Sequence, residues 1–247
     1  MNNLFIEGPI QRGKSTLIRE VLKKFYGPGL DGRPELDGKP EPDSETNAAG
    51  GIGVGGFTVQ RMTFPTQGAD KRFGFRLMEA SAPIWAHTCV VATDEALLKS
   101  DGVFKVVGSF GGRTNLEVFE SKAVALMEQA ARDAEEGRIG IILLDEIGGH
   151  ELSCPGFCKK LYELLDSDIP CIGVIKHPDS ARRMDPTIAK ANEELHEKIT
   201  GPHGEHGEIL YFDGPASSGG PALSDGRPIL SGGAVRATLE EFVAKFI

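Results

Sequence analysis

Close to the start of the chain lies the stretch Gly8-Pro9-Ile10-Gln11-Arg12-Gly13-Lys14-Ser15, and its pattern decides the fold class. It fits G-x-x-x-x-G-K-[ST], a glycine-rich loop whose backbone N–H groups surround phosphate. A short apolar run before it, Leu4-Phe5-Ile6, predicts a buried strand. Apolar residues at helical spacing follow it: Leu17, Ile18, Val21, Leu22 and Phe25. Because strand, loop and helix in this order direct free N–H groups at an anion, the stretch predicts a phosphate-binding P-loop in an α/β fold.

The loop and the residue after it form the predicted nucleotide-binding site: Gly8, Pro9, Ile10, Gln11, Arg12, Gly13, Lys14, Ser15 and Thr16. Lys14 is expected to reach the β- and γ-phosphates as a catalytic residue, and the Ser15 hydroxyl is expected to bind Mg²⁺. Gln11 stands where many P-loops carry a further glycine, so the loop has to bend there without one. Arg12 either adds a charge near the phosphates or points to solvent.

A second motif supplies a metal anchor. The apolar run Ile139 to Leu144 predicts a central parallel strand buried on both faces, and Asp145-Glu146 follows it directly. A carboxylate is costly to bury unless it meets a cation or a partner. We therefore expect Asp145 to hold Mg²⁺ through water, and Glu146 to orient the attacking water or accept its proton. The alternative is an acidic strand end that begins a solvated loop.

The residues after this strand resemble a family signature. Asp145-Glu146-Ile147-Gly148, with Glu151-Leu152, resembles D-E-I-G-x-x-E-L of the small P-loop nucleoside-triphosphatases, which include thermophilic members and the human cancer-related nucleoside-triphosphatase. The resemblance runs from Asn2 to about Ile175, with insertions. Three further segments resemble family motifs: Gly56-Phe57-Thr58 (G-F-x-T, one residue short), Arg72-Phe73-Gly74-Phe75 (R-x-G-F), and Val107-Gly108 with Phe119-Glu120 in the next helix (V-G-x-Y).

The resemblance implies a RecA-like α/β fold, a mostly parallel central sheet with helices on both faces. It also implies slow, Mg²⁺-dependent hydrolysis of nucleoside triphosphates with broad base specificity. Five residues match family positions: Lys14, Ser15, Thr16, Asp145 and Glu146. Val59-Gln60 replaces the acidic pair that is common in the family, so no role is assigned to Arg61. Nothing matches the family's Asn-Arg pair after the last predicted strand, Ile209 to Phe212, so base recognition is not assigned there.

An unusual segment separates the first helix from the next strand. From Gly27 to Gly56, thirteen of thirty residues are Gly or Pro, above the fraction typical of low-complexity segments. The run Leu30 to Glu35 is nearly repeated as Leu36 to Glu41. The composition predicts a surface insertion at about residues 27–56, which is either a tolerated loop or a lid or partner-binding loop.

The rest of the chain predicts further α/β elements in one domain spanning residues 1–247. Phe57 to Phe64 and Arg72 to Glu79 predict an antiparallel strand pair joined by Pro65 to Asp70. Cys171 to Ile175 predicts another buried strand, and Lys176 at its end either touches phosphate or is solvated, with the solvated interpretation preferred. An apolar stripe predicts a C-terminal helix at about residues 234–247 that docks on the sheet.

Composition limits the partners. The chain has 247 residues, is 40% apolar and carries a net charge of −9, which argues against a nucleic-acid partner. No run approaches the ~18 apolar residues of a membrane span, and the first strand leaves no room for a signal peptide, so we expect a cytoplasmic protein. Four cysteines, Cys89, Cys154, Cys158 and Cys171, fit reduced thiols. Nucleoside triphosphates are the expected partners, and no protein partner is assigned.

Two other functions fit the same motifs. A small P-loop kinase would pass the γ-phosphate to an acceptor other than water, although Asp145-Glu146 at a strand end suits water activation better. A nucleotide-gated switch would use the insertion at 27–56 to contact a partner. A guanine-specific GTPase is disfavoured because no N-K-x-D motif follows an apolar strand.

Overall fold

The computed structural model describes residues 2–27, 53–64, 72–82, 94–108, 111–201, 206–215, 217–220, 222–223 and 226–247. Its strands are β1 (Asn3–Glu7), β2 (Gly53–Phe64), β3 (Arg72–Glu79), β4 (Val103–Gly108), β5 (Gly111–Thr114), β6 (Ile139–Ile147), β7 (Cys171–Ile175) and β8 (Gly207–Tyr211). Its helices are α1 (Lys14–Tyr26), α2 (Asp94–Leu98), α3 (Val124–Glu135), α4 (Pro155–Leu165), α5 (Pro178–Arg182), α6 (Pro186–Thr200) and α7 (Gly232–Ala244). Residues 28–52 of the predicted insertion at about 27–56, the predicted connection from Pro65 to Asp70 and Cys89 lie outside the described residues.

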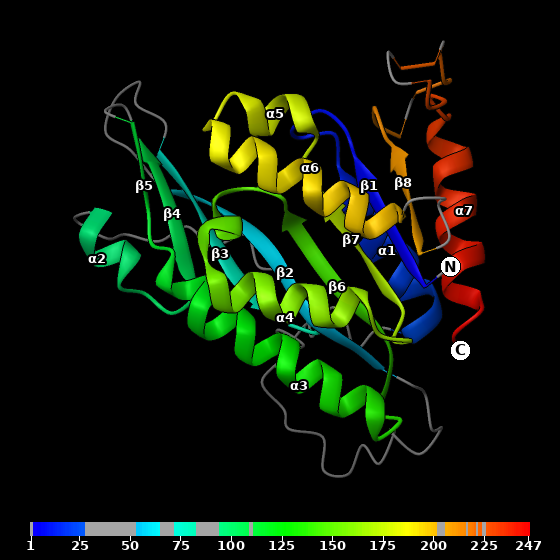
Figure 1. Cartoon of the computed structure of the whole chain (residues 1–247), viewed down its shortest axis with the longest axis horizontal. Helices are drawn as coiled ribbons and strands as arrows, with labels where there is room; N and C mark the ends of the chain where they lie inside the picture. The colour runs from blue at the N-terminus through cyan, green and yellow to red at the C-terminus, as the bar shows by residue number, and fades with distance from the viewer. Residues whose placement is uncertain are drawn as a thin grey trace, which may run out of the picture.

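The described strands form one sheet in the order β5-β4-β3-β2-β6-β7-β1-β8 (Figure 1). Strands β2, β6, β7, β1 and β8 run parallel to one another. Strands β3, β4 and β5 continue from β2 as an antiparallel meander. The predicted α/β class with a mostly parallel sheet is confirmed.

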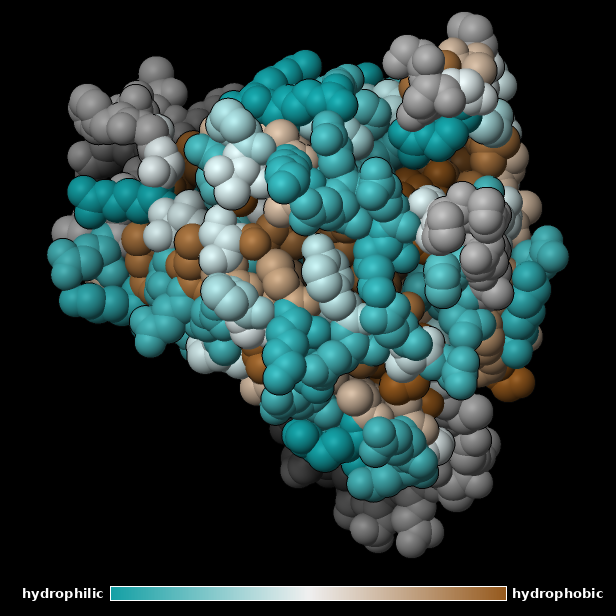
Figure 2. Space-filling model, viewed as in Figure 1, coloured by the Kyte–Doolittle hydropathy of each residue, from teal (hydrophilic) through white to brown (hydrophobic). Residues whose placement is uncertain are grey.

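Helices cover both faces of this sheet, as predicted. In Figure 1, α3, α4 and α6 lie in front of the sheet and α1 lies behind it. Successive strand residues alternate between the two sides: Phe5 packs with the α3, α4 and α6 side, while Leu4 and Ile6 pack with α1 and α7. From the same viewpoint, the outer surface of the covering helices is mostly hydrophilic (Figure 2). None of the described helices combines the length and the apolar character needed to cross a membrane.

The boundary of the predicted insertion was wrong at its C-terminal end. Strand β2 begins at Gly53, so the residues from Gly53 to Gly56 belong to the sheet and pair with β6. A Cβ at Gly55 would lie 2.8 Å from the Ala130 Cβ, and a Cβ at Gly56, where φ is +88°, would lie 2.2 Å from the Leu143 carbonyl oxygen. These glycines therefore allow β2 to approach α3 and β6 closely. Composition alone cannot distinguish glycines that permit close packing from glycines that belong to a loop.

Two further boundaries differ from the predictions. The predicted antiparallel pair, β2 and β3, belongs to a longer meander whose last strand, β5, has too much glycine to show strand alternation. The C-terminal helix begins at Gly232 and ends at Ala244, because the Ser231 hydroxyl accepts a hydrogen bond from the Ala234 N–H at 3.1 Å and caps the helix earlier than predicted.

The close approach of the chain at Gly8 yields a stability prediction. A Cβ at Gly8, where φ is +136°, would lie 2.2 Å from the Phe212 carbonyl oxygen, whereas a Cβ at Gly13, where φ is +82°, would meet nothing within 4 Å. Gly8→Ala should lower the free energy of unfolding by about 3 kcal/mol or more, because strain and a backbone clash add. Gly13→Ala is the matched control. It should lower the free energy of unfolding by only about 1–2 kcal/mol, the cost of the left-handed backbone conformation for alanine. Urea denaturation measures both, and equal losses would contradict the packing at Gly8.

Candidate functional site

Several predicted site residues meet at one edge of the sheet. The carboxyl ends of β1, β6, β7 and β8 point the same way, because these strands are parallel neighbours. β1 leads into the P-loop, and Asp145 and Glu146 lie near the end of β6. Lys176 follows β7. Open α/β sheets bind ligands at this edge.

The P-loop lies between β1 and α1, as predicted, and curves around its own lysine. The Lys14 ammonium donates hydrogen bonds to the carbonyl oxygens of Gly8 at 3.1 Å and Pro9 at 2.7 Å. Gln11 has a φ of 63°, so the loop bends there in the left-handed conformation without a glycine. Burial lowers the pKa of Lys14, the Glu146 charge raises it, and the Lys176 charge lowers it further; the net shift is downward. Lys14 is therefore a buried cation on the inner side of the loop.

Two predicted loop residues point elsewhere. Ile10 is 76% exposed. The Arg12 guanidinium lies 3.5 Å from the Asp213 carboxylate, just after β8. Arg12 and Asp213 border a pocket of about 400 Å³ that is also lined by Gln11, Gly214, Pro215 and Ser217.

Asp145 joins three elements at the end of β6. Its carboxylate accepts hydrogen bonds from the Ser15 hydroxyl at 2.7 Å, the Thr58 hydroxyl at 3.0 Å and the Val59 N–H at 3.0 Å. The side chain is only 1% exposed. Burial raises the pKa of Asp145 to about 6, the nearby Glu146 charge adds to this rise, and the three hydrogen bonds oppose it. The carboxylate is held in place by neutral donors.

Thr58 is a site residue that the sequence reasoning missed. It is fully buried on β2, and its neighbour Phe57 pairs with Leu144 of β6, which places Thr58 beside Asp145. The only sequence signal was its position in the segment that resembles G-F-x-T. The resemblance points to the family, but it does not predict a contact for Thr58.

Glu146 and Asp145 differ in exposure and in backbone conformation, and the strand is irregular at this point. The pairing of β6 with β7 shifts register between Leu144 and Ile147, and Glu146 adopts a φ of 61°. A bulge of this kind redirects a side chain, and a non-glycine residue in this conformation stores about 1–3 kcal/mol of strain. Glu146 is exposed while Asp145 is buried. Its charge still acts on Lys14, so it faces the same site.

Glu151, the other acid in the signature, stabilises the loop after β6. Its carboxylate accepts a hydrogen bond from the Gly149 N–H at 2.6 Å, and burial raises its pKa. The described cysteines, Cys154, Cys158 and Cys171, are free thiols whose pKa burial raises to about 11, 11 and 12. Within the described ranges, no three His, Cys, Asp or Glu side chains converge on a metal position. A site of one hydroxyl and one carboxylate suits Mg²⁺, which commonly keeps waters and substrate phosphates as its other ligands.

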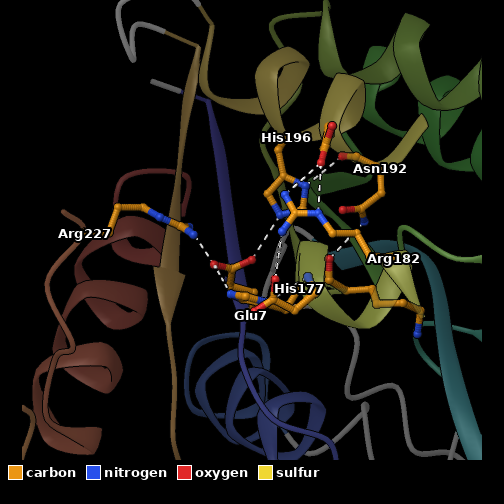
Figure 3. Close-up of polar contacts among 9 residues, drawn as sticks. Glu7, His177, Arg182, Asn192, His196 and Arg227 are labelled. Atoms are coloured by element: carbon orange, nitrogen blue, oxygen red, sulfur yellow. Dashed lines mark hydrogen bonds and ion pairs between the residues drawn. The ribbon is translucent and has the colours of Figure 1, made fainter. Parts of the chain in front are cut away.

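A second buried acid, Glu7, lies at the end of β1 directly before the P-loop (Figure 3). It is fully buried, and its carboxylate lies 2.6 Å from the Arg227 guanidinium, 3.0 Å from the His196 Nε2 and 4.0 Å from the His177 Nε2. Burial alone would raise the pKa of Glu7, but the hydrogen bond from His196 and the charges of Arg227, His196 and His177 outweigh it and lower the pKa. The network ties the strand before the P-loop to α6, to the start of α5 and to the segment before α7. Sequence reasoning missed Glu7, although an acid in a buried strand was a signal.

This network yields a prediction about pH. Glu7→Gln should lower the free energy of unfolding at neutral pH by about 1–3 kcal/mol, because it removes a buried charge that pairs with three partly buried side chains. The pKa of Glu7 lies below its ordinary value of 4.5, so its stabilisation is present above pH 4.5 and is lost as the pH falls through the folded-state pKa. The difference between the two proteins should therefore shrink below pH 4.5.

Denaturation at pH 7 and at a series of acidic pH values measures this difference. Glu20→Gln is the control, since Glu20 pairs with Arg236 on the surface and should lose at most about 1 kcal/mol. A Glu7→Gln effect that does not change with pH would contradict the assigned network.

The chain shares sequence similarity with known proteins. A family model described as NTPase matches residues 45–199, which is more than half of the chain. The nucleoside-triphosphatase THEP1 of Aquifex aeolicus (strain VF5) is 41% identical over 61 residues, which are 25% of this chain and 31% of that protein. The aligned part thus spans about a third of the curated relative. A crystal structure of THEP1 from Aquifex aeolicus aligns with 99% of this chain and 98% of its own, at 17% identity and a TM-score of 0.48.

Proposed function

Since this chain belongs to the NTPase family, we propose that it hydrolyses nucleoside triphosphates to nucleoside diphosphate and phosphate with Mg²⁺ as cofactor. The observation that carries the proposal is the 2.7 Å contact between the Ser15 hydroxyl and the Asp145 carboxylate. This contact supports a site in which a P-loop hydroxyl and a buried acid from a central strand share one cation.

The residues present fit Mg²⁺. Ser15 and Asp145 offer hard oxygen ligands, and the buried Asp145 carboxylate has only neutral hydrogen-bond donors around it in the described structure. A cation would offset the cost of burying this charge, which is the cost that raises its pKa. When bound, Mg²⁺ neutralises charge on the phosphate oxygens. Ser15 would bind it directly, and Asp145 would hold it through water.

The chain's own groups account for the reaction. Backbone N–H groups of the P-loop and the start of α1, residues 8–16, bind the phosphates. The Lys14 ammonium exchanges the Gly8 and Pro9 carbonyl oxygens for phosphate oxygens. A water that Glu146 orients attacks the γ-phosphorus, and the bond from that phosphorus to the bridging oxygen breaks. The bridging electron pair leaves with the diphosphate, and Glu146 accepts the proton from water.

One feature supports slow turnover. An arginine directed at the transferring group supplies much of the rate in fast enzymes of this type. Here Arg12 pairs with Asp213, and the Arg61 guanidinium lies 4.5 Å from the centre of the Phe73 ring. Broad base specificity is proposed from the family resemblance alone, because the pocket beside Arg12 is lined by the polar side chains of Gln11, Arg12, Asp213 and Ser217. The free thiols fit a reducing compartment such as the cytoplasm, and the net charge of −9 favours free nucleotides over nucleic acid as partners.

The experiment that tests this function is phosphate release from ATP, GTP, CTP and UTP with Mg²⁺ or with excess chelator. We expect phosphate from all four nucleotides in the presence of Mg²⁺ and almost none with the chelator. A parallel series adds nucleoside monophosphates and sugars as phosphate acceptors. Phosphate that appears only on an added acceptor would identify a kinase instead.

A matched pair of variants separates water activation from metal binding. Glu146→Gln should bind Mg²⁺ and nucleoside triphosphate normally but hydrolyse it at least ~10²-fold more slowly, because the group that takes the proton is lost. Asp145→Asn should weaken Mg²⁺ binding and the rate together. Glu128→Gln, an exposed change on α3, is the control and should behave like the wild type. Calorimetry and single-turnover kinetics measure these effects, and normal turnover by Glu146→Gln would show that another group positions the water.

A further inference from the structure

Two lysines follow the carboxyl ends of neighbouring parallel strands at the candidate site. Lys14 begins α1 after the P-loop that follows β1, and Lys176 follows β7, which pairs with β1; a third lysine, Lys105, lies on β4. Burial lowers the pKa of Lys105, and the Lys176 charge lowers it further. The Lys176 charge acts on Lys14 in the same direction. Like charges at the edge of the sheet that binds ligands favour an anion between them.

Lys176 is the less expected of these groups, since the sequence favoured a solvated strand end. Its N–H donates a hydrogen bond to the Ile147 carbonyl oxygen at 2.8 Å, which fixes its backbone against β6. The buried Asn192 amide donates to the carbonyl oxygens of Lys176 and Gly148, at 3.0 Å each. The side chain therefore starts from a backbone that is held on both sides.

The side chain of Lys176 runs along the loop after β6. A Cβ on Gly149 would lie 2.9 Å from the Lys176 Cε and 3.0 Å from the Glu151 Oε2, so the space beside Gly149 is taken by the lysine chain. Lys176 is half-buried. Burial raises the pKa of Glu151, whose Oε2 borders the same space, and the Lys176 charge opposes this rise. In the described part of the chain, no ion pair within 4.0 Å joins Lys176 to a carboxylate. A half-buried ammonium at this edge of the sheet, where Lys14 also lies, is suited to a polyanionic ligand.

We propose that Lys176 is a second catalytic cation, which binds the γ-phosphate of the substrate together with Lys14. The proposal rests on the hydrolysis proposed above and names the residue that distinguishes triphosphate from diphosphate. Lys176 donates hydrogen bonds to γ-phosphate oxygens and keeps its protons throughout. As the bond to the bridging oxygen breaks and the bond to water forms, its fixed charge stabilises the negative charge on the transferring group.

Lys176→Gln tests this role by removing the charge while keeping a chain of similar length. We expect hydrolysis at saturating Mg²⁺ and ATP to fall about 10²-fold, the effect of losing one preorganised donor to the transition state. The preference for β,γ-methylene-ATP over ADP should fall about 10-fold or more, while ADP affinity stays within about twofold, because the lost bonds reach only the γ-phosphate. Lys190→Gln, which removes an exposed charge on α6, should match the wild type.

A second variant moves Lys176 without deleting it. Gly149→Ala adds a Cβ against the lysine chain, so it should lower the triphosphate preference in the wild-type background and have no further effect in Lys176→Gln. Equal losses in both backgrounds would mean that the new methyl group acts through another neighbour such as Glu151. That result would contradict the proposal.

The remaining outcomes separate the two proposals. If the wild type releases no phosphate from any nucleotide, the proposed hydrolysis fails, and the binding preference still decides the role of Lys176. If the wild type is active and Lys176→Gln keeps its rate and its triphosphate preference, Lys176 does not bind the γ-phosphate. Equal weakening of triphosphate and ADP binding would also overturn the proposal, because it would place Lys176 on the other phosphates or on the fold.

Discussion

The burial of Asp145 is the constraint on which the rest of the site depends. A carboxylate that is 1% exposed can be tolerated only if its oxygens are bonded, and here the Ser15 and Thr58 hydroxyls and the Val59 N–H bond them. Ser15 lies at the start of α1, which follows β1, whereas Thr58 and Val59 lie on β2; in the sheet, β6 stands between β1 and β2. The same contacts that satisfy the acid therefore fix the P-loop against β6 and set the spacing of the site.

Two of the buried acids at this edge, Glu7 and Asp145, are satisfied in different ways. Glu7 lies among Arg227, His196 and His177, and its pKa is lowered. Asp145 has neutral donors, and burial raises its pKa to about 6. The protein thus places cations in contact with Glu7, whereas the groups bonded to Asp145 are neutral and the Lys14 charge acts on it from nearby. This difference explains why Glu7 suits a structural role beneath the P-loop while Asp145 suits a metal.

The sequence predicted those elements that a continuous run of residues determines, and it missed contacts between residues far apart in the chain. The P-loop, its flanking strand and helix and the β6 strand were predicted because each is a continuous run with its own period. Thr58 and Glu7 were missed because their contacts join residues far apart in the chain: 87 positions separate Thr58 from Asp145, and 189 separate Glu7 from His196. The start of β2 was missed because its glycines have the composition of a loop. The orientation of Glu146 depends on a bulge that leaves no mark in the alternation of side chains.

The most direct test of the central claim is a crystal structure with Mg²⁺ and a nonhydrolysable nucleoside triphosphate. The account predicts the β- and γ-phosphates inside the loop from Gly8 to Ser15. It predicts a metal ion on the Ser15 hydroxyl that reaches Asp145 through water, in place of their present 2.7 Å hydrogen bond. A nucleotide bound outside this loop would contradict the prediction. So would a metal ion bound elsewhere while the hydrogen bond between Ser15 and Asp145 stays intact.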